Sequence, residues 1–310
     1  MARPSDDTLK WLISRYAAVL AAAGDAFEGA ELVTPTGDHF PDEFQRDADS
    51  VVRLVRRMTS YTPLAEDLAL QVAFFEVEEA EAEAAGGCGS CGPTSCAPKK
   101  KAAPATSRVE AIRGGYRLSI NVADTANPVV LTSTVARCLG AMVLAEAEID
   151  DVEEIAAESE IVAAACGFGV LTSAASHVYG KSCGGVSIRR STALSLEEST
   201  LMLALFCAVT DNKPSKARAH LEPSQREAFA DALDFVSCNG KLVRALQQAP
   251  ETLADGHFAI AHEKSLFGRL FGKSEEPGLE APIKKRPPMS EDDKRRLAEA
   301  KALVEEALAE

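Results

Sequence analysis

The stretch TVARCLGAMVL, residues 134–144, decides how the surrounding sequence is organised. Its apolar residues recur at helical spacing around a single charge, Arg137, and they belong to a largely apolar segment that begins at Pro128 and runs to about Glu146. Just before it, the residues 116, 118, 120 and 122 are all apolar and alternate with polar residues, which is typical of a half-buried strand. The pattern therefore predicts a strand followed by an amphipathic core helix.

An acidic segment follows this helix. Between 146 and 160 there are eight carboxylic acids and no Lys or Arg, a composition that predicts a solvated acidic loop leading into the next helix. The residues from Ile161 to Gly180 then carry no charge. They are rich in Ala, Gly, Ser and Thr rather than Leu, so we expect a buried core helix from about 159 to 178 and not a membrane span.

Several further elements are predicted from periodicity and capping residues. Asp6 or Asp7 caps a helix that ends at Gly24, Asp47 or Asp49 opens a second helix, and Ser195 with Glu198 forms a capping box. The other predicted elements are a strand over 68–74, a helix over 222–236 and a charged helix over 290–310. Together these elements predict an α+β fold that is predominantly helical.

Composition excludes some classes of function. Thirty-three Lys and Arg against 47 Asp and Glu give a net charge of −14, which repels nucleic acids and anionic lipids. The first residues, MARPSDDTLKW, carry acids where a secretory signal needs basic residues, and most of the eight cysteines are scattered through apolar segments. We therefore expect a cytoplasmic protein that neither binds nucleic acid nor inserts stably in a membrane.

With these elements in place, the segment 134–144 resembles the motif helix of an uncharacterised bacterial family of zinc-metallopeptidase-like proteins, which reads roughly T-L-A-H-E-L-A-H-V-L-L. The likeness spans about 31–238 and continues in four other blocks. These blocks are PTGDHFPDEFQRDADSVVRLVRRM, GFGVLTSAA, KSCGGVSIRRSTALSLEE and ALFCAVTDNKPSKARAHLEPSQREAF. The resemblance implies a zincin-like core with a small sheet beside the motif helix.

The zinc-binding residues of that family are replaced in this chain. In an HExxH helix, two histidines four residues apart bind Zn²⁺ and the glutamate accepts a proton from the metal-bound water. Here the three positions hold Arg137, Cys138 and Ala141, and the third ligand corresponds to Glu160 or Ala156. The resemblance therefore implies a catalytically inactive pseudopeptidase acting as a binding, scaffold or regulatory module. Alternatively, the likeness extends only to helix patterning.

If the substrate cleft of a zincin persists in this chain, the strand from Tyr116 to Val122 is expected to accept an extended peptide, because edge strands bind such chains. An unidentified protein is therefore the expected partner.

The helix over 134–144 also offers a second interpretation, in which Cys138 is a nucleophile. The neighbouring Arg137 lowers the pKa of its thiol, although most such cysteines are inert core residues.

A cysteine cluster supports a different function. Cys88, Cys91 and Cys96 have the spacing C-x₂-C-x₄-C, at which thiolates can share zinc or an iron–sulfur cluster, although no fourth ligand lies nearby. They lie in an acidic, then glycine-rich, then basic insertion over 78–107. The alternative function is thus a metal-binding or redox-responsive protein, and the competing interpretation is an exposed insertion whose thiols have no designed role.

The remaining segments define the domain organisation. The core comprises 1–77 and 108–250, and a linker over 251–289 precedes the C-terminal helix. Within this linker, SLFGRLFGK has the pattern of an amphipathic segment that docks on a partner groove or a membrane surface, and equally of a short helix that folds back on its own domain. Its apolar face is formed by Leu266, Phe267, Leu270 and Phe271.

Overall fold

The computed structural model describes residues 4–27, 29–76, 108–147, 149, 154–176 and 191–262, together with the backbone of 178–182 and 185–189. These residues belong to one compact unit, Met1–Ser265. The predicted insertion 78–107 with Cys88, Cys91 and Cys96 lies outside the described residues. So do the SLFGRLFGK segment and the helix predicted over 290–310.

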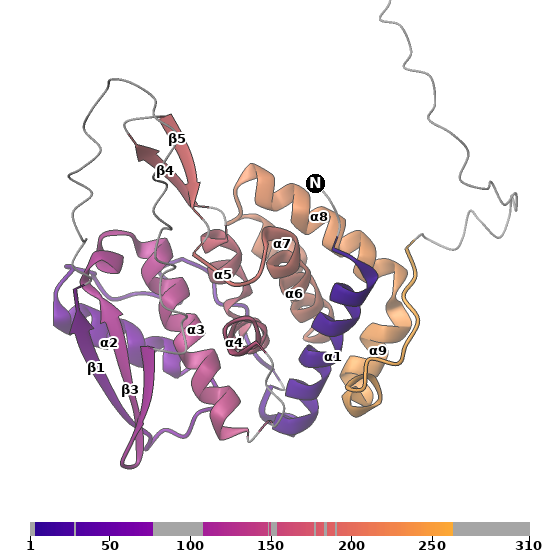
Figure 1. Ribbon diagram of the computed structural model, residues 1–310, viewed down its shortest axis with the longest axis horizontal. Coiled ribbons are helices and arrows are strands. Elements are labelled where there is room, and N and C mark those ends of the chain that lie inside the picture. The colour runs from indigo at the N-terminus through magenta and orange to yellow at the C-terminus, as the bar shows by residue number, and fades with distance from the viewer. Residues whose placement is uncertain are drawn as a thin grey trace, which may run out of the picture. The chain divides into compact units, whose positions relative to one another are not determined.

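The fold is mostly helical with a small mixed sheet, as the sequence predicts (Figure 1). The described helices are α1 Asp6–Ala23, α2 Ala48–Thr59, α3 Pro128–Glu146, α4 Ile155–Ala163, α5 Gly169–Ala175, α6 Leu196–Val209, α7 Pro214–Arg218, α8 Pro223–Cys238 and α9 Gly240–Gln248. The described strands are β1 Ala69–Phe75, β2 Val109–Ile112, β3 Gly115–Asn121, β4 Val178–Ser182 and β5 Gly185–Arg189.

The three-stranded sheet has the order β1-β3-β2, with β1 parallel and β2 antiparallel to β3. Leu118 and Ile120 of β3 are fully buried, which confirms the alternation read from the sequence. Because β3 is the central strand, β1 pairs with one of its edges over Gly115–Asn121, and β2 pairs with the other over Gly115–Leu118. The prediction that Tyr116–Val122 forms an edge for an extended peptide is therefore wrong. The backbone of β4 and β5 forms a separate antiparallel hairpin that the sequence analysis did not predict.

Helix α3 packs between the sheet with α2 and the helices α4 and α5 (Figure 1). Gly140 lies so close to α4 that an added Cβ would be 2.0 Å from the Ser159 carbonyl oxygen. Helix α4 continues through a π-helical turn, Ala164–Phe168, into α5, and Gly167 in that turn has a φ of 88°. Only glycine adopts such a conformation at little cost. The predicted uncharged core helix is thus interrupted by this turn, and it ends at Ala175.

The predicted solvated acidic loop is partly wrong. Glu158 and Glu160 lie inside α4, and each is only 1% exposed. Each carboxylate is opposed by an arginine from another helix: Arg15 Nη2 of α1 lies 2.5 Å from Glu158 Oε2, and Arg137 of α3 contacts Glu160. The sequence could not reveal this pairing because the partners are more than 20 residues away along the chain.

The predicted helix caps are largely correct. Asp47 caps α2, and Ser195 with Glu198 forms the predicted capping box of α6, whereas α1 is capped by Ser5 rather than by Asp6 or Asp7. The final described segment, residues 250–262, packs on the core instead of leaving it as a linker. Asn239 anchors it with two hydrogen bonds of 2.9 Å to the Ala261 backbone.

Two helical segments are long and apolar enough to cross a membrane, namely Pro128–Glu146 and Ile155–Ala175. Within the fold, 61% of the first and 89% of the second apolar window is buried. Their apolar character is thus accounted for by the protein core, as in the central helices of soluble proteins.

Candidate functional site

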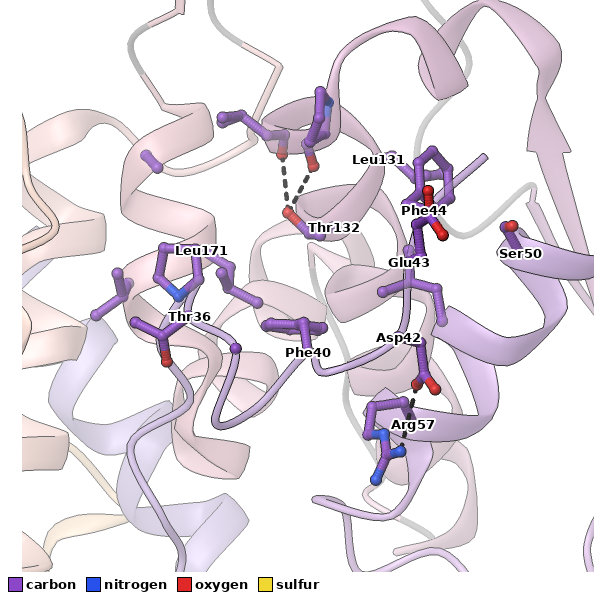
Figure 2. Close-up of a pocket in the computed structure, with 17 residues that line it drawn as sticks. Thr36, Phe40, Asp42, Glu43, Phe44, Ser50, Arg57, Leu131, Thr132 and Leu171 are labelled. Atoms are coloured by element: carbon purple, nitrogen blue, oxygen red, sulfur yellow. Dashed lines mark hydrogen bonds and ion pairs between the residues drawn. The ribbon is translucent and has the colours of Figure 1, made fainter. Parts of the chain in front are cut away.

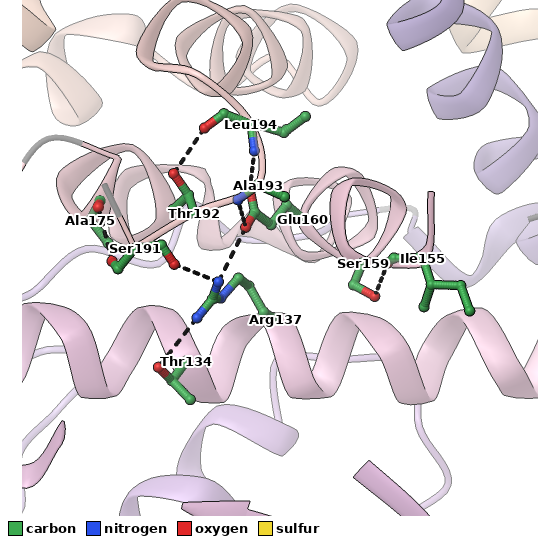
Figure 3. Close-up of polar contacts among 10 residues, drawn as sticks. All are labelled: Thr134, Arg137, Ile155, Ser159, Glu160, Ala175, Ser191, Thr192, Ala193 and Leu194. Carbon is green, nitrogen blue, oxygen red and sulfur yellow. Dashed lines mark hydrogen bonds and ion pairs between the residues drawn. The ribbon is translucent and has the colours of Figure 1, made fainter. Parts of the chain in front are cut away.

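The centre of α3 holds a buried ion pair. Arg137 Nη1 lies 3.5 Å from Glu160 Oε1, and the two side chains are 12% and 1% exposed (Figure 3). The same Nη1 donates a hydrogen bond of 2.5 Å to the Ser191 carbonyl oxygen, and Nη2 contacts the Thr134 hydroxyl at 3.5 Å. The guanidinium therefore joins α3, α4 and the segment that follows the β4–β5 hairpin.

The Glu160 carboxylate has further partners on that segment. The backbone N–H of Ala193 donates to Oε1 at 2.7 Å, and that of Leu194 donates to Oε2 at 2.9 Å. Burial raises the pKa of Glu160 above its usual value. Arg137 and these two N–H groups lower the pKa, but they offset the effect of burial only in part. Both carboxylate oxygens thus have hydrogen-bond donors, and the chain leading into α6 is fastened to α4.

The structure places the four residues predicted from the motif on two adjoining helices, but their chemistry does not fit zinc. Arg137 is a permanent cation and Ala141 has no donor atom. Cys138 is fully buried, and burial raises its pKa to about 11, so its thiol is protonated at neutral pH. Cys138 and Glu160 are residue types that bind metals, but the thiol is protonated and each Glu160 oxygen already accepts a hydrogen bond from a backbone N–H group. Throughout the part of the chain that the structure describes, no three His, Cys, Asp or Glu side chains form a metal-binding group.

Cys138 does not suit nucleophilic catalysis either. The reactive form of cysteine is the thiolate, and a pKa of about 11 leaves almost none of it at neutral pH. Arg137 lowers the pKa of the thiol, but the effect of burial is larger. This residue therefore packs in the core as a small apolar side chain, which is the plainer of the two interpretations of the sequence.

A pocket of about 380 Å³ lies beside the first turn of α3, the helix that carries Arg137 at its centre (Figure 2). It is bounded by the loop 35–44, α2, α3 and α5. Its lining is mainly apolar and includes Phe40, Phe44, Leu54, Leu131, Val170 and Leu171. Open apolar pockets of this size are the usual sites for small ligands and for the anchoring side chains of partners.

The loop that forms one wall is held by internal hydrogen bonds. His39 is 8% exposed, and its Nδ1 lies 3.1 Å from the Thr34 hydroxyl. The Tyr61 hydroxyl donates to the His39 carbonyl oxygen at 3.2 Å. Just before the loop, Val33 N–H donates to the Gly167 carbonyl oxygen at 3.0 Å, which ties it to the π-helical turn. His39 thus serves as a loop anchor.

Charged residues lie only at the mouth of this pocket. Arg57 Nη2 is 3.3 Å from Asp42 Oδ2, and both side chains are substantially exposed. Glu43 is also exposed and makes no ion pair with any residue in the described ranges. Sequence reasoning missed this pocket, although Phe40 and Phe44 within the turn-rich stretch PTGDHFPDEF were a signal. Aromatic residues in a polar loop need an apolar neighbour to cover them.

The predicted metal ligands Cys88, Cys91 and Cys96 and the predicted docking residues Leu266, Phe267, Leu270 and Phe271 lie outside the described residues. A scan against protein-family models and searches of curated proteins and of solved structures found no match to the chain.

Proposed function

We propose that this chain is a catalytically inactive, zincin-like protein that acts in the cytoplasm as a binding or regulatory module for another protein. The observation that carries the proposal is the ion pair between Arg137 and Glu160. It stands on the two helices that, by resemblance of the sequence, would bear the motif histidines and the third ligand of a zincin.

The charge of Arg137 explains how such a fold does without a metal. In a metallopeptidase the metal cation neutralises the carboxylate ligand and joins the two helices. Here the guanidinium supplies the positive charge, and its contact with the Ser191 carbonyl oxygen joins a third segment. In a metallopeptidase a metal-bound water attacks the peptide bond, and Arg137, Cys138 and Ala141 replace the residues that would support it, so the proposed role of this arrangement is binding.

Elemental analysis separates this proposal from the alternative, in which Cys88, Cys91 and Cys96 hold zinc or an iron–sulfur cluster. The protein is purified without a metal-binding tag, and zinc and iron are measured in the wild type and in a variant with all three cysteines replaced by Ser. The Cys238→Ser variant is the matched control, because Cys238 is a partly exposed free cysteine in the described residues. We expect less than about a tenth of an equivalent of either metal in all three proteins.

A near-stoichiometric metal that is lost only in the triple variant would establish the cysteine-based function instead. A near-stoichiometric metal that survives in both variants would place a metal elsewhere and contradict the proposal.

A further inference from the structure

We infer that the pocket between the loop 35–44 and helices α2, α3 and α5 binds a small amphipathic amine. The apolar part of the ligand occupies the pocket, and its ammonium group meets Glu43 at the mouth. This inference goes beyond the proposed function, and it rests on a different part of the molecule from the ion pair of Arg137 and Glu160.

The size and lining of the pocket suit a compact apolar body. Its volume of about 380 Å³ falls within the range of small-molecule sites, which is roughly 300–1,000 Å³. Phe40 and Phe44 from the loop face a floor that includes Leu131 of α3 and Leu171 of α5 (Figure 2). Leu131 is 1% and Leu171 is 3% exposed, so the floor is part of the protein core.

Two hydroxyls around the pocket already have a hydrogen-bond partner within the protein. The Thr132 hydroxyl donates to the Pro128 carbonyl oxygen at 2.8 Å, and the Ser50 hydroxyl accepts from Gln45 N–H at 3.2 Å. A polar ligand would therefore lose water for few partners inside the pocket, whose lining is mainly apolar. An alkyl chain has no such cost, and apolar burial favours its binding.

The charges at the mouth favour a cation over an anion. Among the lining residues there are two carboxylates, Asp42 and Glu43, and one guanidinium, Arg57, which is already paired with Asp42. The carboxylate of Glu43 remains for a ligand.

A helix N-terminus attracts anions, and α3 begins in this pocket, so its free N–H groups must also be considered. Asn127 Oδ1 accepts from the N–H groups of Val129 at 3.0 Å and Val130 at 3.5 Å. This cap removes the donors that an anionic ligand would need.

The test uses three probes with the same alkyl chain, namely octylamine, octanol and octanoate. Their binding to the full chain is measured by isothermal titration calorimetry at pH 7 and below micelle-forming concentrations. We expect saturable binding of one equivalent. Octylamine should bind about two- to fivefold more tightly than octanol, because a partly exposed ion pair contributes modestly, and octanoate should bind most weakly. No saturable binding, or tightest binding of octanoate, would overturn the inference.

Two variants locate the site. Glu43→Gln should abolish the preference for octylamine over octanol and leave octanol binding unchanged. Val129→Trp should weaken all three probes at least tenfold, because Val129 is 38% exposed beside the pocket and a larger side chain there fills it. The matched control is Ile155→Trp at the start of α4, which is 47% exposed and does not line the pocket. Unchanged binding in Val129→Trp, or an equal loss in Ile155→Trp, would place the ligand elsewhere and refute the assignment.

Discussion

The middle of α3 and its first turn lie on the same helix but are built in opposite ways. In the middle, Arg137 and Glu160 are buried and bonded to each other and to the segment 191–194. At the first turn, Val129 is exposed beside an apolar pocket that no side chain of the described residues fills. The first region is closed and polar, whereas the second is open and apolar.

This difference separates stability from binding. A buried charge without its partner is costly, so the middle of α3 constrains the fold and leaves little freedom for a ligand. An empty apolar pocket contributes little to the stability of the protein. A bound ligand that fills the pocket buries its apolar surface and so stabilises the folded state. Substitutions in the middle of α3 should therefore change mainly stability, and substitutions around the pocket should change mainly binding.

Arg137→Met should have the largest effect on stability. It removes the cation opposite Glu160 but keeps most of the side-chain volume, and loss of one partner of a buried pair costs about 3–5 kcal/mol. The measurement is the free energy of unfolding from urea denaturation. A loss below about 1 kcal/mol would mean that the pair contributes no more than a surface ion pair.

A second substitution shows whether the charge is responsible. Arg137→Met combined with Glu160→Gln should be more stable than Arg137→Met alone, because no carboxylate is then left without its cation. Recovery should be incomplete, since a single amide oxygen replaces the two carboxylate oxygens that accept from Ala193 and Leu194. A double variant less stable than Arg137→Met would contradict the electrostatic explanation.

Gly140→Ala should be the next most damaging change. The added Cβ would lie 2.0 Å from the Ser159 carbonyl oxygen and 3.0 Å from Ala163 N, so α3 and α4 must separate. Overpacking of this kind costs about 1–3 kcal/mol, measured by the same urea denaturation. Gly240→Ala is the control, because no atom lies within 4 Å of an added Cβ at that helical position. Equal effects of the two changes would argue against a close helix contact at Gly140.

Phe40→Ala in the pocket wall should cost less stability. A fully buried Phe→Ala change costs about 3–5 kcal/mol, and Phe40 is only half-buried, so we expect about 1–2 kcal/mol. Binding of octylamine should nevertheless fall at least fivefold. A variant that unfolds as readily as Arg137→Met would show that the loop is part of the stabilising core.

Glu43→Gln should have the smallest effect on stability, within about 0.5 kcal/mol, because the side chain is exposed and makes no ion pair with a described residue. A larger loss in thermal or urea denaturation would mean that Glu43 has a structural partner and is not available to a ligand.

Local patterns were sufficient to predict much of the fold. The alternation of Leu118 and Ile120, the caps Asp47 and Ser195, and the apolar character of α3 depend on nearby residues, and the structure agrees with all of them. Long-range pairing was not predictable in this way. The acids 158 and 160 carry no local sign that arginines of other helices oppose them, and the central place of β3 depends on how distant strands pair.

The Arg137–Glu160 centre and the apolar pocket also differ in how far the sequence predicted them. The motif resemblance singled out Arg137 and Glu160, and the structure brings them together. The pocket was missed, because its walls come from four segments and the sequence signal is confined to Phe40 and Phe44 in one of them. An unfilled volume has no sequence pattern of its own.

The most direct test of the proposal supplies the ligands that an active zincin would have. Arg137→His combined with Ala141→His places two imidazoles one helical turn apart beside Glu160, and the third ligand is removed by adding Glu160→Gln. Zinc is titrated into both variants and the wild type, and bound zinc is counted by elemental analysis. We expect one equivalent more in the double variant than in the wild type, and none of that gain when Glu160→Gln is added. No gain in the double variant, or a gain that persists without the Glu160 carboxylate, would contradict a zincin-like origin of this centre.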